Sequence, residues 1–253
     1  IYSMEYSLEQ GSDGGISEPE FLHQVEAFAQ WYRQQPETLH VYSLVDVIKR
    51  LNQNMHGDDP AWYRLPDSRA MSAQYLLLFE MSLPYGLDLN DRMNIRKSAT
   101  RLTATLKSLS SQQAIDLEER AQAWMETNTP LLKNANGTGA TLLFSHIGQR
   151  NSVSMISGEI VSIALISLIL MFVLRSIGLG LLSLIPNLVP AGMAFGIWGL
   201  TVSQVGMASS VVAAMTLGIL VDDTVHFLSK YQHARKDLNL DPEAALRYAF
   251  SSV

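Results

Sequence analysis

Two neighbouring carboxylates, Asp222 and Asp223, stand at the end of a long apolar stretch, and His226 follows within one helical turn. Apolar surroundings favour the neutral form of a carboxyl group, and a second acid beside it favours the neutral form of one of the two further. Such a pair can bind and release a proton near neutral pH. We therefore predict that Asp222 and Asp223 form a proton-binding site, with His226 and Thr224 as candidates to tune it.

Two plainer interpretations of the same residues stay open. The acids could cap a membrane span near the lipid headgroups, and His226 could simply hydrogen-bond a neighbour. Against the cap, residues 224–228 (TVHFL) follow the acids before Ser229 and Lys230, which adds about 7–10 Å of depth on a helix. A carboxylate deep in a bilayer costs about 2.5–3.5 kcal/mol, which favours a functional reason for it. Asp and His alone provide too few ligands for a metal site, and we predict no metal or cofactor.

The elements that must position these acids are membrane spans. Residues 176–221 contain no Asp, Glu, Lys, Arg or His across 46 positions. One span needs about 20 residues, so this run suits two spans joined by a tight turn. With the apolar stretch before Arg175, we expect three transmembrane helices within residues 151–230, at about 153–174, 179–201 and 205–229.

Glycines and flanking charges refine this expectation. Gly192, Gly196 and Gly218 are candidates for close helix packing, because small residues let membrane helices approach. Arg175 follows the first span, and Lys230 and its basic neighbours follow the third. The positive-inside rule places both ends in the cytoplasm. Residues 1–150 then lie on the periplasmic or extracellular side, and residues 231–253 form a cytoplasmic linker or helix that leads to a further span.

The first 150 residues read as an α+β domain. Tyr2, Met4, Tyr6 and Leu8 alternate with polar residues, as in a half-buried strand. Capping boxes are predicted at Ser17–Glu20 and Ser110–Gln113. We expect strands at 2–8, 39–43, 101–107 and 140–146, and helices at 19–35, 44–54, 68–81 and 110–124. Without the inserted helices the order is β-α-β-β-α-β, the ferredoxin-like (split βαβ) arrangement.

Composition excludes several classes of function. The net charge is −6 and no basic stripe is present, so a nucleic-acid partner is not expected. The chain contains no Cys, which rules out disulfides and thiolate metal sites. Four histidines of the first domain are scattered without a catalytic or metal-binding spacing: His23, His40, His56 and His146. We predict that the protein is not an enzyme.

Four segments resemble one family of transporters. The segment GILVDDTVHFLSKY is similar to the fourth-helix motif of the resistance–nodulation–division (RND) superfamily, and the nearest branch is the hydrophobe or lipid exporter-like one related to MMPL proteins. The preceding LRSIGLGLLSLIPNLVPAGMAFGIWGL resembles the same branch, as do GDDPAWYRLP and LPYGLDLNDRMN. The Asp-Asp motif after a Gly-containing helix is fairly specific, whereas the apolar runs alone are not.

The resemblance implies a multi-pass exporter of the bacterial inner membrane, driven by the proton-motive force. Such proteins are internally duplicated, so this chain would be one periplasmic domain and three helices of a longer protein, with its form closer to the second half. Asp222 and Asp223 would be relay residues, completed by polar residues of the other half. The implied partners are the bilayer, the proton, a hydrophobic or lipid-like substrate, the remaining half of the transporter and further copies in a homo-oligomer.

Two rival functions stay open at this point. The same superfamily includes sterol-sensing-like modules, which bind lipid as receptors or scaffolds and do not pump. A second Asp-bearing half elsewhere in the protein would favour transport, and signalling domains would favour a receptor. The other rival is an enzyme with its active site in the first domain, which no nucleophile–base spacing supports.

Overall fold

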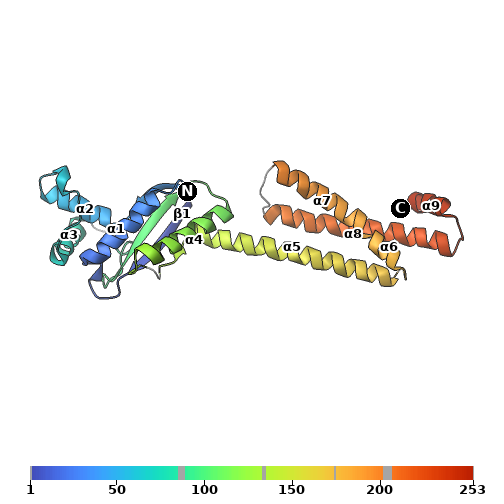
Figure 1. Cartoon of the computed structure of the whole chain (residues 1–253), viewed down its shortest axis with the longest axis horizontal. Coiled ribbons are helices and arrows are strands. Elements are labelled where there is room, and N and C mark those ends of the chain that lie inside the picture. Colours follow the sequence, from blue (N-terminus) through green and yellow to red (C-terminus); the bar gives the residue numbers. More distant parts are fainter. Residues whose placement is uncertain (1, 85–88, 133–134, 174, 202–206, 253) are drawn as a thin grey trace. The chain divides into compact units, whose positions relative to one another are not determined.

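The computed structural model describes residues 2–84, 89–132, 135–173, 175–201 and 207–252. The chain forms two compact units, unit 1 (Ile1–Ile147) and unit 2 (Gly148–Val253). Unit 1 combines a small sheet with helices, whereas the elements described in unit 2 are all helical (Figure 1).

The sheet of unit 1 has four antiparallel strands in the order β2-β3-β1-β4. The long central strands are β1 (Tyr2–Glu9) and β3 (Ala99–Leu106), which pair in register from Tyr2 with Leu106 to Glu9 with Ala99. The edges are β2 (Thr38–Tyr42) and the short β4 (Gly137–Thr138). The predicted alternation in β1 is confirmed, because Met4, Tyr6 and Leu8 are fully buried.

Two amphipathic helices cover one face of this sheet, α1 (Pro19–Arg33) and α4 (Ser111–Asn128) (Figure 1). Phe28 and Tyr32 of α1 pack on Tyr6, with ring centroids 5.1 and 5.6 Å away. The hydroxyl groups of Tyr6 and Tyr32 are 2.6 Å apart. The capping box of Ser110 and Gln113 is present at the start of α4, as predicted.

An insertion of helices separates β2 from β3. It contains α2 (Leu44–Met55), the 3-10 turn η2 (Pro60–Trp62) and α3 (Arg69–Ser82). Ser43 and Ser68 cap the two α-helices, because their hydroxyl oxygens accept hydrogen bonds from the N–H groups of Val45 and Met71. The helices expected at 44–54 and 68–81 are therefore confirmed.

Two local predictions in unit 1 are wrong. Residues 140–146, expected to be a strand, begin the helix α5 (Ala140–Val173), and the fourth strand is the short β4 before it. Short apolar runs such as ATLLFSH fit a strand or a buried helix equally well. The capping box at Ser17 is absent as well, because Ser17 lies buried in the 3-10 turn η1 (Gly15–Ser17) and Glu18 is the N-cap of α1.

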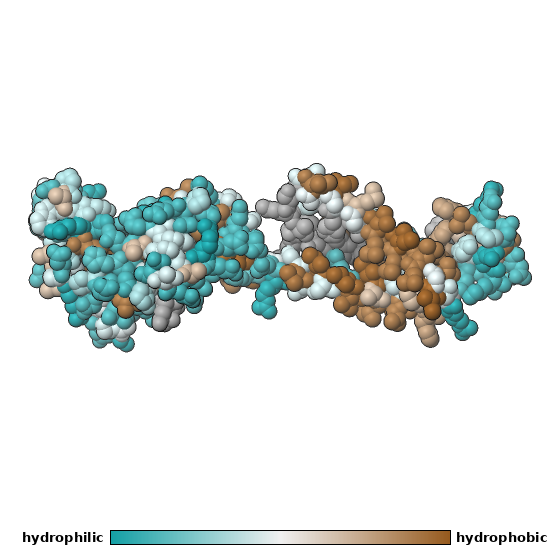
Figure 2. Space-filling model, in the orientation of Figure 1, coloured by the Kyte–Doolittle hydropathy of each residue, from teal (hydrophilic) through white to brown (hydrophobic). Residues whose placement is uncertain are grey.

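Unit 2 consists of the rest of α5, then α6 (Ile177–Leu182), α7 (Leu184–Thr201), α8 (Met207–Lys236) and α9 (Pro242–Ser252). Figure 2 shows hydrophobic surface gathered over these helices, whereas the surface of unit 1 is mostly hydrophilic. Within the described residues, two helical segments are long and apolar enough to cross a membrane, Ala140–Phe172 and Ile177–Thr201. They correspond to the first and second predicted spans.

The third predicted span, 205–229, stays a prediction. Its start at 205 lies outside the described residues, and its remainder lies in α8. The first candidate span begins earlier than the predicted residue 153, because α5 runs unbroken from residue 140. In the second, Pro190 stays inside α7 without ending it, as membrane helices allow where neighbours satisfy the freed carbonyl group.

Candidate functional site in the membrane unit

The two acids predicted for the proton relay lie on α8, near the middle of its length. The side chain of Asp222 is 74% exposed and that of His226 is 67% exposed. Met215 and Ile219 are exposed as well, and their spacing puts them on the same helical face as Asp222 and His226. This set of four residues, the exposed face of α8, is therefore left uncovered by the described helices of this chain.

His226 pairs with Asp222. Its Nε2 lies 3.6 Å from Asp222 Oδ1, the distance of an ion pair when the imidazole is protonated. The contact joins residues i and i+4, as the sequence spacing allowed. Asp223 is exposed too but points about 100° away from Asp222 around the helix, because neighbouring residues differ by that angle. The two acids therefore face different surroundings.

Thr224 lies on the opposite, buried side of α8. It is 7% exposed, and its Oγ1 donates a hydrogen bond to the Leu220 carbonyl oxygen at 2.8 Å. One turn later, Leu228 forms a buried cluster with Leu170 of α5, against which Leu179 of α6 packs. The turn of α8 that contains Asp222 and Asp223, the acidic turn, is thus exposed on one side and packed on the other.

The glycines predicted to bring helices together do not do so within the described structure. A Cβ atom on Gly192, Gly196 or Gly218 would meet no described atom within 4 Å, so their packing role stays a prediction. The close approach occurs at Gly180 instead. A Cβ there would lie 2.1 Å from Met171 Cγ and 3.0 Å from Met171 Cα, which places α6 directly against α5.

Two further polar residues of α5 come to attention only in the structure. Glu159 is half-buried, and its Oε1 is shielded without a hydrogen-bond partner. Ser167 is buried, and its Oγ also has no partner among the described residues. The sequence gave no signal for Ser167, since a lone serine in an apolar run is unremarkable.

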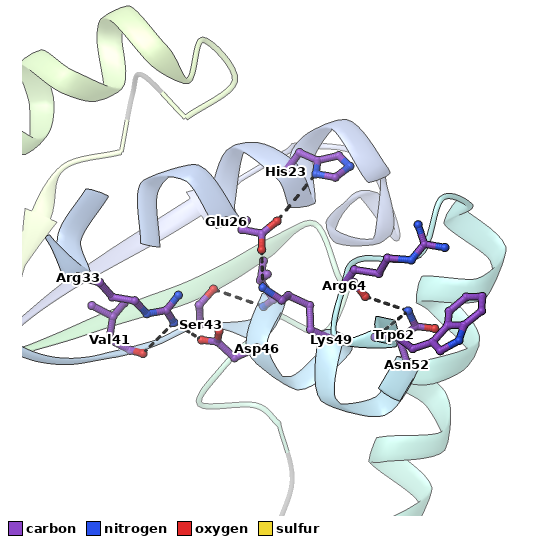
Figure 3. A network of polar contacts seen from close by, with 11 residues as sticks. His23, Glu26, Arg33, Val41, Ser43, Asp46, Lys49, Asn52, Trp62 and Arg64 are labelled. Carbon is purple, nitrogen blue, oxygen red and sulfur yellow. Dashed lines mark hydrogen bonds and ion pairs between the residues drawn. The ribbon is translucent and has the colours of Figure 1, made fainter. Parts of the chain in front are cut away.

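Unit 1 contains a separate polar network, between α1 and α2 (Figure 3). Arg33 Nη2 lies 2.6 Å from Asp46 Oδ2, and Lys49 pairs with Glu26. These ion pairs tie the inserted helix α2 to α1. We assign them a structural role, because each cation is matched with a carboxylate across the two helices.

The loop between α2 and α3 is held by one buried amide. Asn52 Nδ2 donates to the carbonyl oxygens of Trp62 and Arg64 at 3.1 and 2.9 Å, and Asn52 Oδ1 accepts from the Tyr75 hydroxyl at 3.1 Å. The ring of His56 stacks on Trp62 with centroids 3.7 Å apart. Among the described residues, no three His, Asp or Glu side chains converge to hold a metal ion.

Comparison with known protein families identifies the one to which part of the chain is similar. A model of the MMPL family matches residues 97–253 of the chain, which covers β3, α4, β4 and all the helices of unit 2. No curated protein matches the chain. The match includes the whole candidate site, from Ser167 on α5 to His226 on α8.

Proposed function

The chain belongs to the MMPL family, and from that premise we propose that it is part of an exporter driven by the proton-motive force. Family membership places the chain among membrane exporters of hydrophobic substrates. The proton drive, the lipid-like nature of the substrate and the role of Asp222 and Asp223 are our proposal.

The observation that carries the proposal is the exposed face of α8. Two ionisable side chains, Asp222 and His226, lie uncovered in the unit that contains the candidate membrane-spanning helices. Lipid does not solvate such groups, and a carboxylate there costs about 2.5–3.5 kcal/mol. We propose that polar residues on helices outside this chain cover this face, and that this chain belongs to the second half of a duplicated transporter.

Protonation would then change how α8 packs. A protonated Asp222 loses its electrostatic attraction to His226 and its need for a cationic partner. The helix can shift against its neighbours as the proton arrives and leaves. Movement of one repeat against the other is the general basis of alternating access in transporters.

We further propose where each unit lies. Lys230, Arg235 and Lys236 would be cytoplasmic, which puts unit 1 in the periplasm of a bacterial inner-membrane protein. Unit 1 would be a ferredoxin-like, split βαβ domain, supported by the strand order β2-β3-β1-β4 and by the connecting helices α1 and α4. It would bind the substrate without chemically changing it.

The test is export of a fluorescent lipid analogue by the full-length protein in proteoliposomes with an imposed proton gradient. We expect transport to depend on the gradient and to be lost with Asp222→Asn plus Asp223→Asn. A matched variant, Asp237→Asn, changes a carboxylate beyond the end of α8 and should transport normally. Binding of the analogue without gradient-dependent movement would instead indicate a sterol-sensing-like lipid-binding module.

A further inference from the structure

Ser167 on α5 holds a buried hydroxyl group that nothing in the described structure satisfies. The residue is 5% exposed, and its Oγ has no hydrogen-bond partner. Hydroxyl groups on apolar helices ordinarily donate to the carbonyl group one turn back. Thr201, Thr216 and Thr224 do so, to the carbonyl oxygens of Ile197, Val212 and Leu220 at 2.9, 2.8 and 2.8 Å. The hydroxyl hydrogen of Ser167 therefore makes no hydrogen bond within the described structure.

The position of Ser167 follows from the packing of α5 on α8. The two helices run in the same direction within unit 2 (Figure 1), and Leu170 of α5 forms a buried cluster with Leu228 of α8. Ser167 precedes Leu170 by three residues, and Thr224 precedes Leu228 by four. Each pair shares a helical face, and the two steps along the helices are about 4.5 and 6 Å. Ser167 and Thr224 therefore lie at about the same height along the two helices.

The chemistry of the two hydroxyl groups is complementary. Thr224 uses its hydrogen on the Leu220 carbonyl oxygen, so its Oγ1 can take part in a further bond only as an acceptor. Ser167 has the donor that such a bond requires. Thr224 directly follows Asp223 in the sequence, so this bond would reach the acidic turn from the packed side of α8.

We propose that Ser167 is a positioning residue for the proton site, which rests on the proposed function. Its hydroxyl group donates to Thr224 Oγ1 in one state of the transport cycle and releases it in another. The bond links the acidic turn of α8 to α5, the helix that continues without a break from unit 1. Movement of the proton site is thereby passed to the helix that leads to the substrate-binding domain.

Proton-driven transport by three variants of the full-length protein tests the role of the hydroxyl group. Ser167→Ala should lower the transport rate about fivefold, the effect of one hydrogen bond. Ser167→Thr keeps the donor and should restore the rate to within about twofold of the unmodified protein. Ser157→Ala, on the same helix, removes an exposed hydroxyl that is bonded to the Ser154 carbonyl oxygen and should change nothing. Equal rates for Ser167→Ala and the unmodified protein would overturn the proposal.

Cysteine cross-linking tests the contact itself without measuring transport. The chain has no native Cys, so Ser167→Cys plus Thr224→Cys introduces a single pair. A disulfide requires Cβ atoms about 3.5–4.5 Å apart, and we expect an oxidant to form it in proteoliposomes. Leu165→Cys plus Thr224→Cys is the control, because Leu165 is exposed on another side of α5. Equal cross-linking in both pairs, or none in the Ser167 pair, would contradict the contact.

The two failures can be told apart. Normal transport by the double Asp variant, together with a Ser167–Thr224 cross-link, would overturn the proposed function and leave the contact standing. Loss of transport in the double Asp variant, with no effect of Ser167→Ala, would overturn this inference alone.

Discussion

Gly180 leaves no room for a side chain between α6 and α5, so Gly180→Ala should destabilise unit 2. The new Cβ would lie 2.1 Å from Met171 Cγ, which can move, and 3.0 Å from Met171 Cα and N, which cannot move without the helix. Forcing an extra methyl group into a packed interface costs about 1–3 kcal/mol. The better helix propensity of alanine offsets up to about 1 kcal/mol of this cost. We expect a net loss of about 1–2 kcal/mol.

The measurement is unfolding of the purified chain in mixed micelles, followed by circular dichroism as a denaturing detergent is added. Gly192→Ala is the matched control, because a Cβ there would meet nothing within 4 Å. It should be as stable as the unmodified chain or up to about 1 kcal/mol more stable. Equal midpoints for the two variants, or a larger loss for Gly192→Ala, would refute the packing of α6 on α5.

Two further predictions concern unit 1. Burial raises the pKa of the Tyr6 hydroxyl well above its usual value, with Tyr32 raising it further, and burial raises the pKa of Tyr32 too. Because the unfolded chain releases these protons first, the two tyrosines should contribute a fall in the free energy of unfolding above about pH 10 and no pH dependence well below it. The fall above about pH 10 should be less steep in Tyr6→Phe plus Tyr32→Phe. Denaturant unfolding of residues 1–147 at several pH values checks this, and identical pH dependence in both proteins would contradict it. Asn52→Ala should cost about 3 kcal/mol, because it removes the three hydrogen bonds of a buried amide, and limited proteolysis should then cut residues 56–66. The exposed Gln112→Ala serves as its control, and equal resistance to the protease would refute the role of Asn52.

The sequence predicted those parts of the fold in which a local pattern decides the structure. Alternation in residues 2–8 found β1, and the spacing of Ser110 and Gln113 found the start of α4. Residues 140–146 were mistaken for a strand because their apolar run is too short to show its period. Ser17 failed as a cap because the preceding residues fold into a 3-10 turn that buries it.

The candidate site also contains features that local spacing predicts and features that depend on tertiary packing. The contact of Asp222 with His226 depends only on i, i+4 spacing along one helix, so the sequence could predict it. Ser167 and Gly180 depend on which faces of α5, α6 and α8 meet. That choice is made by tertiary packing, and nothing in the residues around Ser167 or Gly180 encodes it. Of the glycines in the apolar run, the sequence selected those on α7 and α8, whereas the tight contact lies on α6.

The most direct test of the account is proton movement that accompanies transport. A pH-sensitive dye enclosed in proteoliposomes with the full-length protein reports protons that cross the membrane when the hydrophobic substrate is added. We predict a substrate-dependent proton flux that is lost in Asp222→Asn plus Asp223→Asn and kept in Asp237→Asn. An unchanged flux in the double variant would show that the acidic pair on α8 does not carry the protons.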